Sequence, residues 1–120
     1  MSDDRRQRGL EWMRTVYGWH VPTVEGAFTE LTVDHLFGEV WAREGLSVRD
    51  RRLLLLGLLM GAGGLDDVIG LQLDSALAQG DLSGDDLREM VVFLTHYAGW
   101  PKGAKLNSAV EERLARRDRS

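Results

Sequence analysis

The sequence predicts an all-α protein, and three observations support that prediction. Apolar residues recur three and four positions apart along most of the 120-residue chain, which is the spacing of one helix face. Residues that cap helices, together with glycines, stand where these segments begin and end. No stretch alternates apolar and polar residues with the β-branched enrichment of a strand. We therefore expect a single domain over residues 1–120, built as a bundle of about six helices.

Two helices are expected in the first third of the chain. The first extends from about residue 4 to residue 17, and a glycine and a proline within residues 18–22 end it. Its apolar face consists of Leu10, Met13, Val16 and Tyr17. The second helix extends from about Val24 to Trp41 and carries apolar residues at helical spacing over its length.

The third helix has a well-marked first turn and an unusual body. Ser47 can cap the free amides, and Asp50 stands three residues later, where its carboxylate can reach back in a capping box. Residues 53–60 are apolar on every side, so protein must enclose this helix all round. A domain of this size rarely does so alone. We therefore expect part of the helix to face another subunit, and the glycines within residues 61–64 to end it.

Capping residues mark the next two helices. Asp66 or Asp67 starts the fourth helix, which ends at Gly80. Ser83 and Asp86 repeat the capping-box spacing and open the fifth helix. An apolar stripe then follows on one face, which indicates that this face is buried.

The last helix follows a predicted turn. Gly99 ends the fifth helix, and Trp100 and Pro101 are expected to form the turn. The sixth helix then extends from about Lys102 to Arg116. Its apolar stripe consists of Leu106, Val110 and Leu114, four positions apart.

Composition excludes several classes of protein. The net charge of −4 gives no general basic face for nucleic acid, and the arginine clusters within residues 5–8 and 113–119 are interpreted as frayed, solvated arms. Without cysteine the chain cannot form disulfides or thiolate–zinc sites. Its longest apolar run is far shorter than the roughly 20 residues of a membrane span, and its first residues carry no apolar signal core. We therefore expect a cytoplasmic protein with no nucleic-acid or membrane partner.

A series of short motifs resembles the carboxymuconolactone decarboxylase family. They are RTVYG at 14–18, GEVWAREGL at 38–46, RRL at 51–53, ALAQG at 76–80 and YAGWP at 97–101. The resemblance covers nearly the whole chain and keeps the order and rough spacing of the family's motifs. It implies an all-helical fold shared with alkylhydroperoxidase-D-like proteins, and assembly as a homo-oligomer, a trimer or a hexamer. It also implies cofactor-free decarboxylation of a carboxylated muconolactone in the catabolism of aromatic compounds.

Three features depart from the family pattern. The segment between His20 and Trp41 is about two helical turns shorter than in typical decarboxylases. Family decarboxylases carry a histidine in the fourth helix, where this chain has Gln72, and an arginine two positions later, where it has Asp74. The peroxidase branch uses a Cys-x-x-Cys pair, and this chain has no cysteine. We therefore expect a changed pocket and no thiol peroxidase activity.

Decarboxylation leaves negative charge that must delocalise into a neighbouring carbonyl or lactone. The site therefore needs a cation for the substrate carboxylate, hydrogen-bond donors for the enolate, and an acid that returns a proton. Glu39 is the first candidate for the acid, because its neighbours Phe37 and Trp41 provide apolar surroundings that suit a carboxyl group for acid–base work. The alternative is an exposed glutamate that pairs with Arg43 at i+4.

Two arginines and one glutamine are the candidates for substrate binding. A guanidinium binds a carboxylate through two parallel hydrogen bonds, which makes Arg43 and Arg51 the candidate cations. The alternatives are a helix-surface pair with Glu39 for Arg43 and a solvated helix start for Arg51. Gln72 can orient a substrate carbonyl but cannot carry a proton at neutral pH. Its alternative role is that of a polar residue beside an interface.

His96 is the second candidate for catalysis, because an imidazole can compensate for the histidine missing at position 72. The alternative is a hydrogen-bonded packing residue, and His20 and His35 are weaker candidates. The histidines share no metal-ligand spacing, so we expect no metal. The family resemblance implies that no other cofactor takes part. Trp41 and Trp100, at predicted helix ends, can line a pocket for a flat ring, or else contribute to the core or to subunit contacts.

Three hypotheses for function follow. The first is a cofactor-independent decarboxylase, or a related lyase or isomerase, that acts on a small carboxylated lactone or aromatic-derived ring. The second is a diverged family member with a different or larger ring substrate, which the shortened segment before Trp41 favours. The third is a non-catalytic oligomer that binds a ligand or a protein partner, which the absence of the family histidine favours.

Overall fold

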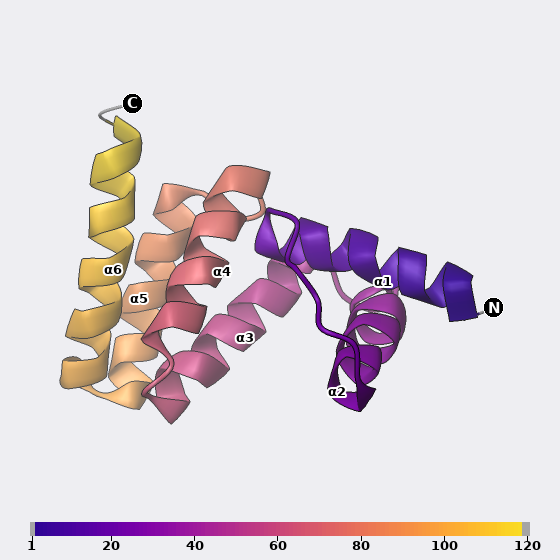
Figure 1. The fold of residues 1–120 in the computed structure, drawn as a ribbon. Helices are drawn as coiled ribbons and strands as arrows, with labels where there is room; N and C mark the ends of the chain where they lie inside the picture. Colours follow the sequence, from indigo (N-terminus) through magenta and orange to yellow (C-terminus); the bar gives the residue numbers. More distant parts are fainter. Residues whose placement is uncertain (1, 119–120) are drawn as a thin grey trace. The chain divides into compact units, whose positions relative to one another are not determined.

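The computed structural model describes residues 2–118, with the side chains of residues 4–118, and every secondary-structure element in them is a helix. The elements are α1 (Ser2–Tyr17), α2 (Ala27–Glu30), η1 (Leu31–Trp41), α3 (Val48–Ala62), α4 (Asp66–Gln79), α5 (Gly84–Ala98) and α6 (Trp100–Asp118) (Figure 1). The predicted all-α class is confirmed. The chain divides into two compact units, Met1–Val48 and Arg49–Ser120, and the single domain expected over residues 1–120 stays a prediction.

The first unit packs α1 against η1. Its buried apolar side chains are Met13, Val16, Val33, Phe37 and Trp41. The Phe37 ring lies 5.5 Å from that of Tyr17, between ring centroids, which joins the two helices. A Cβ at Gly9 would lie 1.9 Å from the carbonyl oxygen of Val33. Glycine at this position therefore lets the two backbones come close together.

The second predicted helix differs from the structure at its start and in its winding. It begins at Ala27 instead of Val24, because Gly26 has a φ of 145°, outside the helical region. From Leu31 onward the chain winds as a π-helix, in which hydrogen bonds join residues five apart. Its buried apolar residues stand four positions apart, and this spacing fits an α-turn and a wider turn alike. The sequence pattern therefore predicted a helix but not its type.

The second unit contains α3 to α6, with α5 and α6 side by side (Figure 1). The capping box predicted at the start of α5 is confirmed: the Asp86 amide donates to Ser83 Oγ, and the Ser83 amide donates to Asp86 Oδ2, both at 3.0 Å. Gly80 ends α4 with a φ of 77°, as predicted. The turn predicted at Trp100 and Pro101 is wrong, because α6 begins at Trp100. Proline is tolerated in a first helical turn, where its missing amide has no partner to lose.

The apolar body of α3 is partly buried in the second unit. Leu56, Leu59 and Met60 belong to its core. Leu54 and Leu58 are 64% and 69% exposed in the single chain. Exposed leucines on one side of the helix are consistent with the expected contact with another subunit. The subunit contact itself stays a prediction. Neither α3 nor any other described helix is both long and apolar enough to cross a bilayer.

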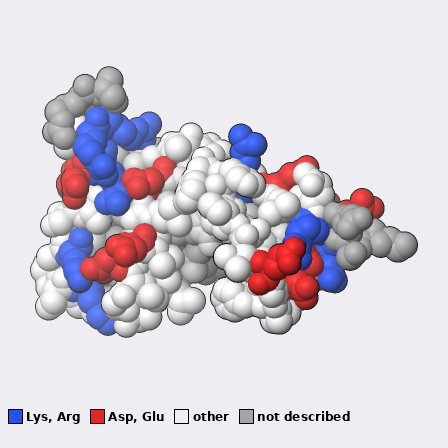
Figure 2. All heavy atoms as spheres, viewed as in Figure 1, with Lys and Arg blue, Asp and Glu red and all other residues white. Residues whose placement is uncertain are grey.

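The arginine clusters belong to helices, so their interpretation as frayed arms is wrong over the described residues. Arg5, Arg6 and Arg8 lie on α1, and each of them hydrogen-bonds to a group of η1. Arg116 and Arg117 lie in the last turn of α6, where Figure 2 shows basic side chains gathered. Cations are favourable there because the carbonyl end of a helix carries partial negative charge. The last arginine of that cluster lies outside the described residues.

Candidate functional site

Glu39 lies near the end of η1, and its partners come from two helices. Nη1 of Arg5 donates a hydrogen bond to Glu39 Oε1 at 3.3 Å, and Nδ1 of His35 lies 3.2 Å from the same oxygen. The Glu39 side chain is 43% exposed in the single chain, so the apolar surroundings expected from Phe37 and Trp41 are wrong there: those two rings are buried in the core, and Glu39 has polar partners. The alternative of a Glu39–Arg43 pair is not observed among the described residues, where no ion pair joins the two side chains. Glu39 instead has a guanidinium and an imidazole within hydrogen-bond range.

Trp41 and Arg43 flank the end of η1 and differ in their surroundings. Trp41 is buried, and its ring stacks on Phe37 with centroids 6.1 Å apart and planes 15° apart. Arg43 follows in the turn after η1, and its side chain is exposed. Among the described residues, no hydrogen bond or ion pair engages its guanidinium. Arg43 is therefore available to a carboxylate from solution.

A second carboxylate of η1 is held by α1. Asp34 is buried, and Arg6 Nε donates to its Oδ1 while Arg6 Nη2 donates to its Oδ2 at 3.3 Å. This two-pronged hydrogen bond from Arg6 lowers the pKa of Asp34 below its ordinary value of 3.8. Arg8 Nε donates to the carbonyl oxygen of Gly38 at 2.9 Å. Three arginines of α1 thus fix the polar side of η1 on which Glu39 stands.

The Asp34–Arg6 pair predicts acid-sensitive stability. Because folding lowers the pKa of Asp34, its stabilisation is complete above the unfolded-state value and is lost as the pH falls through the lower folded-state value. Asp34→Asn should lower the free energy of unfolding near pH 6 and flatten its decline below about pH 4. Urea denaturation followed by circular dichroism, repeated from about pH 6 down to about pH 2.5, measures both effects. Asp85→Asn is the control, because its carboxylate is 96% exposed; matching acid profiles for Asp34→Asn and wild type would contradict the prediction.

In the second unit a buried arginine forms a hydrogen bond to Gln72. Arg52 on α3 is 0% exposed, and its Nη1 donates to Gln72 Oε1 at 2.9 Å. Its Nη2 donates to Ser75 Oγ at 3.1 Å, and its Nε donates to Asp81 Oδ2 at 2.7 Å. Gln72 is buried, so its carbonyl oxygen serves this network rather than open solvent. A substrate-binding role for Gln72 stays a prediction, which would have to rest on its amide nitrogen.

His96 and Trp100 lie together at the junction of α5 and α6. Their rings meet edge to face with centroids 5.3 Å apart. His96 Nδ1 donates to the carbonyl oxygen of Val92 at 2.7 Å, which leaves Nε2 as its free nitrogen. Trp100 is 65% exposed, so the pair lies at the surface of the single chain.

Arg51, at the start of α3, is partly exposed and has interaction partners of its own.

The structure groups the predicted site residues differently from the sequence analysis. The first unit holds Glu39, Trp41 and Arg43, and the second holds Arg51, Gln72, His96 and Trp100. Sequence reasoning missed two participants, Arg5 beside Glu39 and Arg52 beside Gln72, and it treated His35 only as a weaker candidate. The i,i+4 spacing of His35 and Glu39 was a usable signal, and so was an arginine at the head of an apolar helix. Arg5 gave no local signal, because it meets Glu39 only through the packing of α1.

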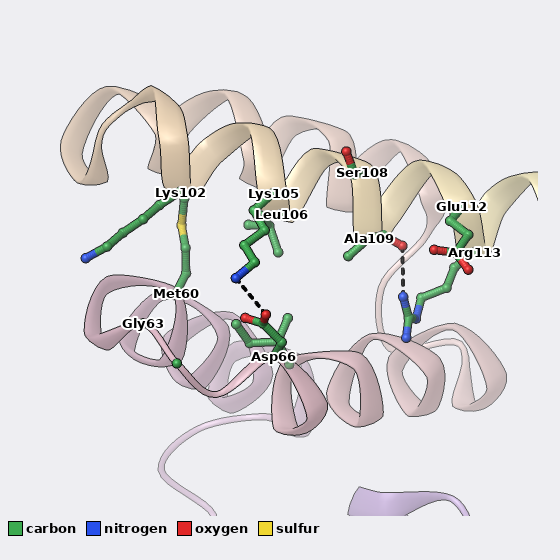
Figure 3. Close-up of a pocket in the computed structure, with 12 residues that line it drawn as sticks. Met60, Gly63, Asp66, Lys102, Lys105, Leu106, Ser108, Ala109, Glu112 and Arg113 are labelled. Atoms are coloured by element: carbon green, nitrogen blue, oxygen red, sulfur yellow. Dashed lines mark hydrogen bonds and ion pairs between the residues drawn. The ribbon is translucent and has the colours of Figure 1, made fainter.

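A cavity of about 500 Å³ lies in the second unit, between the end of α3, the first turns of α4, and α6 (Figure 3). Met60, Ile69 and Leu106 line its apolar floor. Lys102 and Lys105 of α6 stand at one end of it. None of the residues predicted for the site lines this cavity. Over the described part of the chain, no group of three histidine, aspartate or glutamate side chains is arranged to hold a metal ion.

The chain is similar in sequence to a decarboxylase. It is 32% identical to the 4-carboxymuconolactone decarboxylase of Acinetobacter baylyi over a 121-residue alignment, which covers 93% of this chain and 89% of that protein. No model of a protein family matches the chain, and no solved structure does. The similarity therefore extends over nearly the full length of both proteins, including the segments that hold Glu39 and Arg52.

Proposed function

This chain belongs to the carboxymuconolactone decarboxylase family, and from that premise we propose that it is a cofactor-independent decarboxylase or related lyase. Its substrate is a small carboxylated lactone or an aromatic-derived ring. The observation that carries the proposal is the similarity over 93% of the chain. An alkylhydroperoxidase-D-like fold and a trimeric or hexameric assembly belong to the same proposal, and the exposed leucines of α3 support the assembly.

Glu39 is assigned the role of proton carrier, and its contact with the His35 imidazole supports this role. Loss of carbon dioxide from the substrate leaves the electron pair of the broken carbon–carbon bond on the ring, where a carbonyl delocalises it. Glu39 then delivers a proton to that carbon. His35, with Nδ1 3.2 Å from Glu39 Oε1, is close enough to pass a replacement proton from solvent to Glu39. Arg5, at 3.3 Å, stabilises the carboxylate that remains.

Substrate binding is assigned first to Arg43. Its guanidinium is exposed and lies four residues after Glu39, so it can receive the substrate carboxylate through paired hydrogen bonds. Arg51 belongs to the second unit, where it stays a separate candidate cation. Trp41 is buried and stacked on Phe37, which favours its alternative role in the core. Trp100 belongs to the second unit, where its exposed side chain stays a separate candidate for contact with a ring. His96 stays a second acid–base candidate through its free Nε2.

The test is release of carbon dioxide, or loss of ultraviolet absorbance, when the purified protein is mixed with carboxymuconolactone. We expect turnover above the rate without protein. If carboxymuconolactone is inert but another ring carboxylate releases carbon dioxide, the protein is a diverged lyase with a different substrate. If no ring carboxylate is turned over, the decarboxylase proposal fails.

A non-catalytic oligomer that binds a ligand is the second candidate, and one observation favours it. Gln72, which stands where family decarboxylases carry a histidine, is committed to Arg52 through a 2.9 Å hydrogen bond. A side chain that serves the core in this way supplies no proton. The alternative predicts ring-carboxylate binding without turnover.

A further inference from the structure

The cavity between α3, α4 and α6 is a distinct feature of the second unit. Its volume of about 500 Å³ falls within the range of small-molecule sites, roughly 300–1,000 Å³. Met60, Ile69 and Leu106 line it, are buried, and provide an apolar floor. Burial of apolar ligand surface on such a floor is favourable in water. The floor therefore suits a compact apolar body.

One end of the cavity carries two ammonium groups. Figure 3 shows Lys105 extending from α6 to Asp66, the first residue of α4, and Lys102 extending to the opposite side, away from Asp66. Lys102 Nζ donates to the carbonyl oxygen of Gly61 at 2.7 Å, and Lys105 Nζ lies 2.7 Å from Asp66 Oδ2. The side chains of Lys105 and Asp66 are 69% and 57% exposed. An exposed ion pair such as Lys105–Asp66 stabilises a fold weakly, so Lys105 can turn to a ligand. The hydrogen bond of Lys102 to Gly61 is also exposed, so water can replace it when Lys102 turns to a ligand.

At the other end of the cavity, the positive charge is held by partners within the protein and a negative charge stands beside it. Arg113 Nε donates to Asp74 Oδ1 at 2.8 Å, and Arg113 Nη1 donates to the carbonyl oxygen of Ala109 at 3.1 Å. Glu112 also lines this end, where it repels an anion. It stands ten residues after Lys102, which is roughly 15 Å along a helix axis. A ligand with one negative group therefore prefers the lysine end.

We propose that this cavity binds a small organic monocarboxylate with one apolar ring. The ring lies on Met60, Ile69 and Leu106, and the carboxylate lies between Lys102 and Lys105. The site is separate from Glu39 and goes beyond the proposed decarboxylase activity, on which it does not depend.

The test uses the full-length protein, with benzoate as the probe and benzamide as its uncharged counterpart. Titration calorimetry gives the dissociation constants, and amide chemical shifts in two-dimensional NMR locate the ligand. Benzoate should shift the amides of Ile69, Leu106 and Ala109, and benzamide should bind at least about fivefold more weakly. The double variant Lys102→Met/Lys105→Met should weaken benzoate binding by at least about fivefold and leave benzamide binding unchanged.

Two matched variants make the result decisive. Arg88→Met removes an exposed cation outside the cavity and should leave benzoate binding unchanged. Glu39→Gln should also leave it unchanged, so failure of this site and failure of the decarboxylase proposal can be told apart. Equal affinity for benzoate and benzamide, shifts confined to other residues, or no binding at millimolar benzoate would each overturn the proposal.

Discussion

Replacing Arg52 by alanine is expected to lower the free energy of unfolding by about 3–5 kcal/mol, which is the usual effect of removing one partner of a buried ion pair. Arg52 is 0% exposed, and three hydrogen-bonded partners surround its guanidinium. The substitution leaves Gln72 and Ser75 buried without their donor and opens a cavity where the long side chain was. Because a domain of this size has a total stability of about 5–15 kcal/mol, the variant should be close to unfolding.

Urea denaturation of both proteins measures this effect. Arg88→Ala is the matched control, because Arg88 makes a two-pronged pair with Glu111 on the surface, with both distances 2.9 Å. The side chains of that pair are 52% and 42% exposed, so solvent replaces the lost hydrogen bonds and the change should be much smaller. A loss for Arg52→Ala no larger than that for Arg88→Ala would show that the buried network does not stabilise the second unit.

Glu39→Gln should reduce decarboxylation by at least about a hundredfold, which is a moderate general-acid effect. The amide keeps the shape of the side chain and can still contact Arg5 and His35, but it cannot give up and regain a proton. Binding of substrate should therefore change less than the turnover number. The comparison uses kcat and KM for carbon dioxide release, measured on the ring carboxylate that the wild type turns over best.

Glu44→Gln is the control for this second prediction, because it removes an exposed carboxylate from the turn that follows η1 without touching Glu39. It should retain the activity of the wild type. His35→Gln should show an intermediate loss, since an imidazole beside Glu39 can both accept and release a proton and a glutamine amide cannot. Full activity of Glu39→Gln would remove Glu39 from the mechanism and leave His96 as the candidate acid.

Local chemistry explains which parts of the fold could be predicted. The capping box of Ser83 and Asp86 joins residues three apart, so its hydrogen bonds could be predicted from residue types and spacing alone. The structure confirms them. The end of α4 at Gly80 follows in the same way from a residue that tolerates a positive φ. The start of α2 and the π-winding of η1 were not predicted, because the apolar spacing of that segment fits more than one helix type.

The partners of the candidate residues were harder to predict, because they come from distant parts of the chain. The hydrogen bond between Arg5 and Glu39 spans 34 positions, and the one between Arg52 and Gln72 spans 20. Each depends on which helices pack together and in what rotation. The His35–Glu39 contact differs, because its two residues are four positions apart and so show a helical spacing. The sequence analysis nevertheless treated His35 only as a weaker candidate for catalysis.

The sequence by itself determined that this protein is helical, where several of its helices begin and end, and that it belongs with the carboxymuconolactone decarboxylases, since these depend on short motifs and their order. Tertiary structure alone decided that Glu39 meets Arg5 and His35, and that Gln72 serves a buried guanidinium. The physical reason is that a helix fixes neighbours up to about one turn away, whereas the packing of one helix on another fixes the rest.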